Sequence, residues 1–158
     1  MQNPQAESQK GFTFPEVLIV LIIIAILAVI ALPQLFSSVQ LNRILTASSL
    51  ITNKLSEAKM LAVKQNKNIS LVIDETDLQV WLESNSTVIG SKESLPSGIK
   101  VKVSPNTSAT KEYITFSSMG TLVTTPSTVL PYYEARSLEH PINVSISGKI
   151  TRGEMRNY

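Results

Sequence analysis

The sequence predicts an α+β fold, in which one long N-terminal helix packs on an antiparallel β-sheet. Three observations support this prediction. An apolar run lies near the N-terminus, a helical stripe of apolar residues follows it, and from Ile69 onward the hydrophobic period changes to two. A long helix followed only by strands is the layout of an α+β domain. The length of 158 residues allows one small domain besides the apolar run.

Residues 12–33 form the first part of the predicted helix. Val17 to Leu32 are all apolar, and Glu16 is the one charged residue between Phe12 and Leu32. At ~1.5 Å per residue the segment spans roughly 30 Å, about one bilayer core. It is longer than the apolar region of about 7–15 residues in a cleaved secretory signal. A domain this small could hardly cover a helix that is apolar on every face. We therefore expect the segment to insert into membrane lipid.

Glu16 needs an explanation, because a charged side chain at the centre of a bilayer costs ~2.5–3.5 kcal/mol on insertion scales. A cut between Gly11 and Phe12 would provide one. Pro15 would then lie in the first helical turn, where its missing N–H costs nothing. Glu16 would lie one turn from a new terminal amine, which lowers the cost of its charge. The pattern thus predicts a leader over residues 1–11 that is removed.

The segment resembles the leader and N-terminal helix of type IV pilins and of the pseudopilins of type II secretion. Gly11, Phe12, Thr13, Glu16 and Pro33 carry the resemblance. It implies that a prepilin peptidase cuts after Gly11 and that the amine of Phe12 is methylated. It also implies assembly roles for Glu16 and Pro33, with Glu16 neutralising the terminal amine of a neighbouring subunit. The alternative is a contact between Glu16 and the amine of its own Phe12.

The same resemblance implies a single-pass protein of the bacterial inner membrane. Its globular domain would be extracytoplasmic, and other pilin or pseudopilin subunits would be its partners in a pilus or pseudopilus. The leader carries Lys10 against Glu7. This near balance gives little positive-inside signal, so the expected orientation rests on the resemblance.

Residues 34–67 are predicted to continue as an amphipathic helix. Pro33 should kink or loosen the helix without ending it, and helix should fade over residues 64–68. A stripe with steps of three and four residues, apolar except at Ser48, comprises Leu41, Ile44, Ser48, Ile51, Leu55, Ala58 and Ala62. The stripe is expected to pack on the sheet, with a coiled-coil partner as the alternative. The polar residues between these positions, Lys54 and Lys64 among them, are expected to be solvated.

Residues 68–158 are predicted to form a β-rich domain. Alternating residues predict strands at 69–74, 78–83, 98–104, 112–116 and 142–147, and polar stretches predict loops at 84–97, 104–110 and 124–128. The end of the helix with the first strand, and the two segments "ITFSSMGTL" and "INVSISGKITRG", resemble the GspH/FimT branch of minor pseudopilins.

The last hairpin contains the candidate DNA contacts, Lys149, Arg152 and Arg156. We expect Ile146 to share a buried face with the residues before it, which places Lys149 at the tip of a three-residue loop. FimT-like minor pilins contact DNA through a glycine-arginine-x-arginine motif at this point. Here lysine replaces the first arginine and Thr151 replaces the second, and threonine brings no charge. The resemblance therefore implies weak DNA contact, with a solvated hairpin as the alternative.

Catalysis and metal binding are not expected. The chain has no cysteine, one histidine (His140) and no glycine-rich phosphate loop. Asp74, Glu75 and Asp77 crowd one turn, where acidic residues are common for conformational reasons. We predict no cofactor and no metal. The predicted function is a structural subunit of a type IV filament machine, for type II secretion or pilus assembly; the alternative is a DNA-binding minor pilin for DNA uptake.

Overall fold

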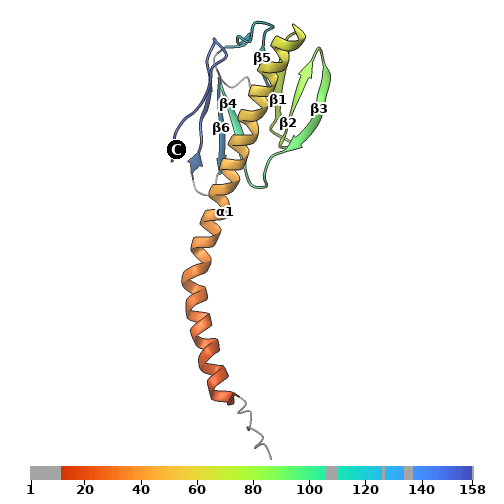
Figure 1. Cartoon of the computed structure of the whole chain (residues 1–158). Helices are drawn as coiled ribbons and strands as arrows, with labels where there is room; N and C mark the ends of the chain where they lie inside the picture. The colour runs from red at the N-terminus through yellow and green to blue at the C-terminus, as the bar shows by residue number, and fades with distance from the viewer. Residues whose placement is uncertain (1–11, 106–109, 126, 134–136, 158) are drawn as a thin grey trace, which may run out of the picture. The chain divides into compact units, whose positions relative to one another are not determined.

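The computed structural model describes residues 12–105, 110–125, 127–133 and 137–157 (Figure 1). Helix α1 (Phe14–Gln65) comes first, and every later element among the described residues is a strand. The chain divides into two units, Met1–Val39 and Gln40–Tyr158, so that α1 contributes to both. The α+β prediction is confirmed. Because α1 continues through Pro33, this proline does not end the helix.

Thr13 starts α1. Its carbonyl oxygen accepts hydrogen bonds from the backbone N–H groups of Glu16 and Val17, at 3.1 and 3.2 Å. The Glu16 carboxylate lies 3.5 Å from the backbone N of Thr13, a contact that corresponds to one half of a capping box. Pro15 lies inside this first turn, where its missing N–H has no partner to lose.

The helical part of the first unit carries apolar side chains on all sides. From Val17 to Leu32 these side chains are exposed, except for a half-buried position at Ala28. An 18-residue window of α1 has a mean hydropathy of 3.1 and is not buried at all. Among the described residues, α1 is the one helix that is long and apolar enough to cross a membrane, by length and composition.

In the second unit, α1 buries the predicted stripe. Ile44, Ser48, Ile51, Leu55, Ala58 and Ala62 are all fully buried, and Ala47 joins them. Leu41 is 39% exposed and does not belong to the stripe, so its prediction was wrong. The buried helical residues form one core with apolar residues of the strands. The expected packing of helix on sheet is thus confirmed (Figure 1).

The helix ends at Gln65, where the sequence predicts that it fades. Asn66 adopts a left-handed conformation with φ of 52°. The N–H of Lys67 donates to the Ala62 carbonyl at 3.2 Å, and the N–H of Asn66 donates to the Val63 carbonyl at 3.4 Å. These two bonds make a Schellman motif, which satisfies carbonyls that the last turn would otherwise leave unpaired.

The described strands form two antiparallel sheets. The first has the order β3-β2-β1-β5 and consists of β1 (Ile69–Asp74), β2 (Gln79–Ser84), β3 (Thr87–Ser94) and β5 (Lys111–Phe116). In the second, β6 (Ser127–Tyr133) pairs with β4 (Lys100–Ser104), β7 (Leu138–Glu139) and β8 (Ile142–Val144). Strands β9 (Ile150–Arg152) and β10 (Arg156–Asn157) extend it by pairing with β8 and β7.

Residues 117–123 connect the two sheets. The N–H of Val123 donates to the Thr115 carbonyl of β5 at 2.8 Å. The N–H of Leu122 donates to the Ile146 carbonyl, in the loop after β8, at 2.9 Å. The connecting segment is therefore hydrogen-bonded both to a strand of the first sheet and to a loop of the second.

Two predicted loops contain strands. Residues 84–97 were expected to be irregular, but they include β3, and residues 124–128 include the start of β6. Strand β3 is mostly exposed, so it lacks the alternation of buried and exposed residues that reveals a strand in a sequence. Lys54 of α1 bonds Glu93 of β3 at 2.8 Å and Glu57 at 3.1 Å. Lys54 is therefore an anchor for this edge strand, which corrects its expected solvated role.

Candidate assembly sites

The N-terminal candidate site centres on Glu16. Its carboxylate is exposed in the first turn of α1, among the exposed aromatic side chains of Phe12 and Phe14 and the apolar run. The contact with the Thr13 N–H, at 3.5 Å, is long for a hydrogen bond. A carboxylate has about four acceptor positions, so Glu16 retains capacity for a further donor. Gly11 lies outside the described residues, and its cleavage remains a prediction.

The C-terminal candidate site begins at the loop between β8 and β9. Val144 pairs with Ile150, so five residues, 145–149, form the loop instead of the three predicted. The N–H of Gly148 donates to the Ser145 carbonyl at 2.8 Å, and the N–H of Ser145 donates to the Lys149 carbonyl at 3.0 Å. Ile146 lies inside this loop and is 63% exposed. The predicted buried face therefore stops at Val144, and the expectation for Ile146 was wrong.

The three predicted DNA contacts are all exposed, but each has its own surroundings. Lys149 lies in the loop after β8. Arg152 lies on β9, and its Nη1 donates to the Ser49 hydroxyl of α1 at 3.3 Å. Arg156 lies on β10, and its Nε pairs with the Glu139 carboxylate. The structure thus places the three cations on separate elements, and DNA contact stays a prediction.

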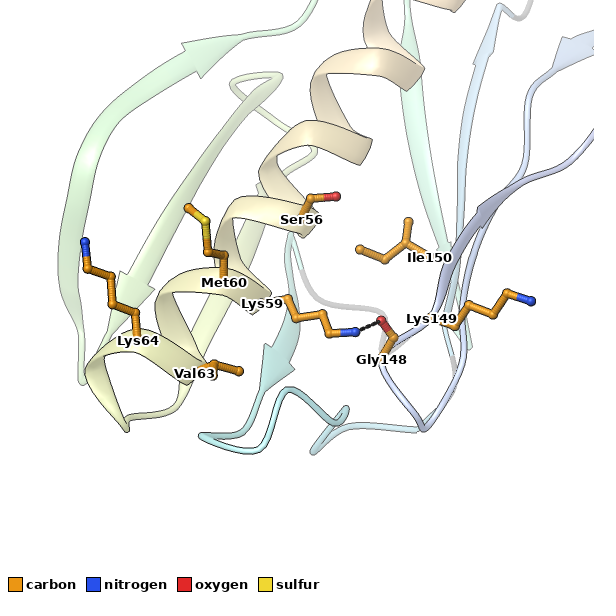
Figure 2. Close-up of a pocket in the computed structure, with 8 residues that line it drawn as sticks. All are labelled: Ser56, Lys59, Met60, Val63, Lys64, Gly148, Lys149 and Ile150. Atoms are coloured by element: carbon orange, nitrogen blue, oxygen red, sulfur yellow. Dashed lines mark hydrogen bonds between the residues drawn. The ribbon is translucent and has the colours of Figure 1, made fainter.

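A groove that the sequence did not reveal lies between the last turns of α1 and the loop after β8 (Figure 2). We call it the lysine groove; it has a volume of about 710 Å³ and is lined chiefly by Lys59, Met60, Val63, Lys64, Lys149 and Ile150. The Lys59 ammonium donates to the Gly148 carbonyl at 2.9 Å. One signal was present in the sequence, since Met60 and Val63 are apolar but lie off the buried stripe.

Hydrogen bonds from the backbone to a side chain shape the acidic turn between β1 and β2. The Asp74 carboxylate accepts the backbone N–H groups of Thr76 and Asp77, at 2.9 and 3.1 Å. These bonds, with the Asp77 N–H foremost, hold the pKa of Asp74 below its ordinary value, assisted by Lys111. Burial, and then repulsion from Glu112, raises the pKa of Glu75. In the part of the chain that the structure describes, no three side chains of metal-binding type gather.

His140 is buried rather than simply a loop residue. Its Nε2 lies 2.9 Å from the Gly153 carbonyl, and since a carbonyl can only accept, Nε2 carries the hydrogen. Its Nδ1 is buried and has no hydrogen-bond partner among the described residues. This arrangement ties the segment after β9 to the residues before β8, which is a structural role.

Comparisons with known proteins bear on the N-terminal segment and on the fold. The model of the prokaryotic N-terminal methylation motif matches residues 8–32, a range that includes Gly11, Phe12 and Glu16. The chain carries the N-terminal methylation motif. The predicted resemblance at the N-terminus is confirmed by this match. A comparison with curated protein sequences gives no match.

Solved structures share the fold. The type IV minor pilin FimU of Pseudomonas aeruginosa aligns with a TM-score of 0.59 and 18% identity, over 72% of this chain and 90% of FimU. The minor pseudopilin EpsH from the type II secretion system of Vibrio cholerae aligns with a TM-score of 0.54 and 12% identity, over 69% of this chain and 94% of EpsH. The chain therefore has the fold of a minor pilin or pseudopilin, as the sequence predicts.

Proposed function

We propose that the chain is a minor pilin or pseudopilin, a structural and non-catalytic subunit of a type IV filament machine. The machine serves either type II secretion or type IV pilus assembly. The methylation motif at residues 8–32 and the likeness to FimU and EpsH support this proposal. A prepilin peptidase removes residues 1–11 after Gly11, and Phe12 becomes the methylated N-terminus.

The observation that carries the proposal is the carboxylate of Glu16 on an otherwise apolar and exposed helix surface. A membrane tether gains nothing from this charge, which weakens insertion. An assembling subunit does gain from it, because an amine of a neighbouring subunit can pair with the carboxylate in a medium of low dielectric constant. The long contact to Thr13 leaves the carboxylate able to form that pair.

The remaining parts of the chain have roles that follow from this assignment. The segment 12–33 holds the subunit in the inner membrane in a single pass and packs against other subunits after assembly. Pro33, at the end of the apolar run, provides a position where the helix can loosen during that transfer. The globular unit is extracytoplasmic. DNA uptake remains the alternative, but the pairing of Arg156 with Glu139 favours the structural role.

The experiment replaces Glu16 and follows assembly. Glu16→Ala should insert into the membrane at least as well as the wild type, because it removes a charge from the apolar segment. We expect its incorporation into sheared filaments, or its co-purification with other pilin subunits, to be lost. Glu154→Ala removes an exposed carboxylate from the globular unit and is the matched control. Wild-type incorporation of Glu16→Ala would overturn the proposal.

A further inference from the structure

The lysine groove includes exposed apolar side chains at the end of α1. Met60 is 61% exposed and Val63 is 53% exposed, both on the last turns of α1 (Figure 2). Met119, which is 82% exposed, lies next to Gly120, and Gly120 packs against Val63. Met60 and Val63 are three residues apart on α1 and so share one face, which offers a partner apolar area to bury.

The charge of the lysine groove has one sign. Lys64 and Lys149 stand at its two sides, with Lys59 between them (Figure 2). No carboxylate is among the described residues that line it. Figure 2 shows the ammonium groups of Lys64 and Lys149 directed outward from the two sides, where they give the surface around the groove a positive potential. The groove is therefore complementary to an acidic partner.

The groove is also held in shape. The bond from Lys59 to Gly148, at 2.9 Å, joins α1 to the loop after β8. The bond from Leu122 to Ile146, at 2.9 Å, joins the same loop to residues 117–123. A β-carbon on Gly148 would lie 2.0 Å from the Gly120 carbonyl oxygen, so the two loops are in close backbone contact. A surface fixed in this way loses little conformational entropy when a partner binds.

We propose that the lysine groove docks a segment of a neighbouring filament subunit that carries both apolar and acidic side chains. The proposal rests on the function proposed above. The apolar side chains would bury against Met60 and Val63, while Asp or Glu residues pair with Lys64 and Lys149. A nucleic-acid backbone offers anions but little that would cover the two apolar side chains.

The test uses the full chain in cells, in which the absence of cysteine allows a unique thiol. Met60→Cys is coupled to benzophenone maleimide and irradiated, and mass spectrometry identifies the cross-linked molecule and peptide. We expect a peptide of another pilin-like subunit with apolar and acidic residues. Adding Lys64→Glu and Lys149→Glu should lower the adduct yield at least about tenfold. Lys67→Glu with Lys102→Glu, a matched double reversal at exposed positions that do not line the groove, should leave the yield unchanged.

Val88→Cys supplies a second control, since Val88 is exposed on β3 and does not line the groove. It should not give the same adduct. The inference is overturned by an adduct to nucleic acid or lipid alone, by a yield that the reversals leave unchanged, or by no adduct in a sample where the chain is incorporated. Incorporation is measured separately with Glu16→Ala, so that failure of the groove and failure of the proposed function give different results.

Discussion

The ammonium of Lys59 donates a 2.9 Å hydrogen bond to the carbonyl oxygen of Gly148, which lies 89 residues away in the sequence. The bond fixes the loop after β8 against the last turns of α1. It is possible because Gly148 is backbone only, which lets the loop approach both Lys59 and Gly120. A charged donor makes this bond stronger than one between neutral groups.

Gly148→Ala should destabilise the globular unit by about 2–4 kcal/mol. Gly148 has φ of 72°, and an added β-carbon would meet the Gly120 carbonyl oxygen at 2.0 Å. Gly90→Ala is the matched control, because Gly90 has φ of 76° but has nothing within 4 Å of the same position. Gly90→Ala should lower the free energy of unfolding by about 1 kcal/mol, because only the positive φ is unfavourable for alanine there. Urea unfolding of the full chain in detergent, followed by the fluorescence of buried Trp81, measures both; equal losses would contradict the close approach.

Asp74 should make stability depend on acid pH. Its pKa is lowered in the folded state, chiefly by the Asp77 N–H. The stabilisation is therefore complete above its unfolded pKa of about 3.9 and is lost as pH falls through the folded value. Asp74→Asn should lower the free energy of unfolding by on the order of 1 kcal/mol at pH 7 and flatten its decline below pH ~4. If the free energy of unfolding had the same pH dependence in Asp74→Asn and the wild type, the role of Asp74 would be refuted.

Glu75 should behave in the opposite way. Burial and repulsion from Glu112 raise its pKa, so its charged form opposes folding at neutral pH. Glu75→Gln should raise the free energy of unfolding at pH 7, and the gain should disappear as pH falls below the unfolded pKa of about 4.3. The same urea titrations across pH test it. A loss of stability at pH 7 would show that the Glu75 charge is favourable.

The helix and the first sheet strands could be predicted because burial leaves a period in the sequence. Ile44, Ile51 and Leu55 repeat at helical spacing and are fully buried. Strand β1 has the predicted bounds, although its residues are almost all buried and do not alternate. Strand β3 could not be predicted in this way, because an exposed edge strand needs no buried face. The division of the strands into two sheets depends on pairings between distant segments, which no local pattern encodes.

Of the candidate sites, the one at Glu16 could be predicted from the sequence and the lysine groove could not. Glu16 stands out in the sequence because one charge interrupts an apolar run. The lysine groove joins Lys59 and Lys64 to Lys149 through contacts between α1 and a distant loop. The ion pair between Arg156 and Glu139 is also a tertiary contact. The sequence does not show it, and Arg156 was therefore predicted to be available for DNA.

Processing should remove residues 1–11. Intact mass spectrometry of the protein extracted from membranes should give the mass of residues 12–158 with one methyl group on Phe12. Gly11→Val should block the cut by placing a branched side chain at the cleaved bond, whereas Ser8→Val, elsewhere in the leader, should leave it intact. A mature terminus near Leu32, or an intact Met1, would contradict the assignment of the leader.

DNA binding should be weak and sensitive to salt. Removal of the leader takes away Lys10 and Glu7, so the net charge stays at +2. With about three phosphate contacts, the slope of log affinity against log salt should lie between about −2 and −3, with binding fading near physiological salt. Because Arg156 is already paired with Glu139, we expect the shallower slope of about −2.

The decisive measurement is a salt titration of the full chain in nonionic detergent against duplex DNA. Lys149→Glu with Arg152→Glu should abolish the residual binding while the Trp81 signal stays native, because both side chains are exposed. Lys67→Glu with Lys102→Glu changes the net charge equally at exposed positions and is the control. It should weaken binding only through the lost net charge. Tight binding at physiological salt that only the first pair abolishes would make DNA uptake the primary function. Equal effects of the two pairs would show that the affinity is a property of net charge, with no site at the last hairpin.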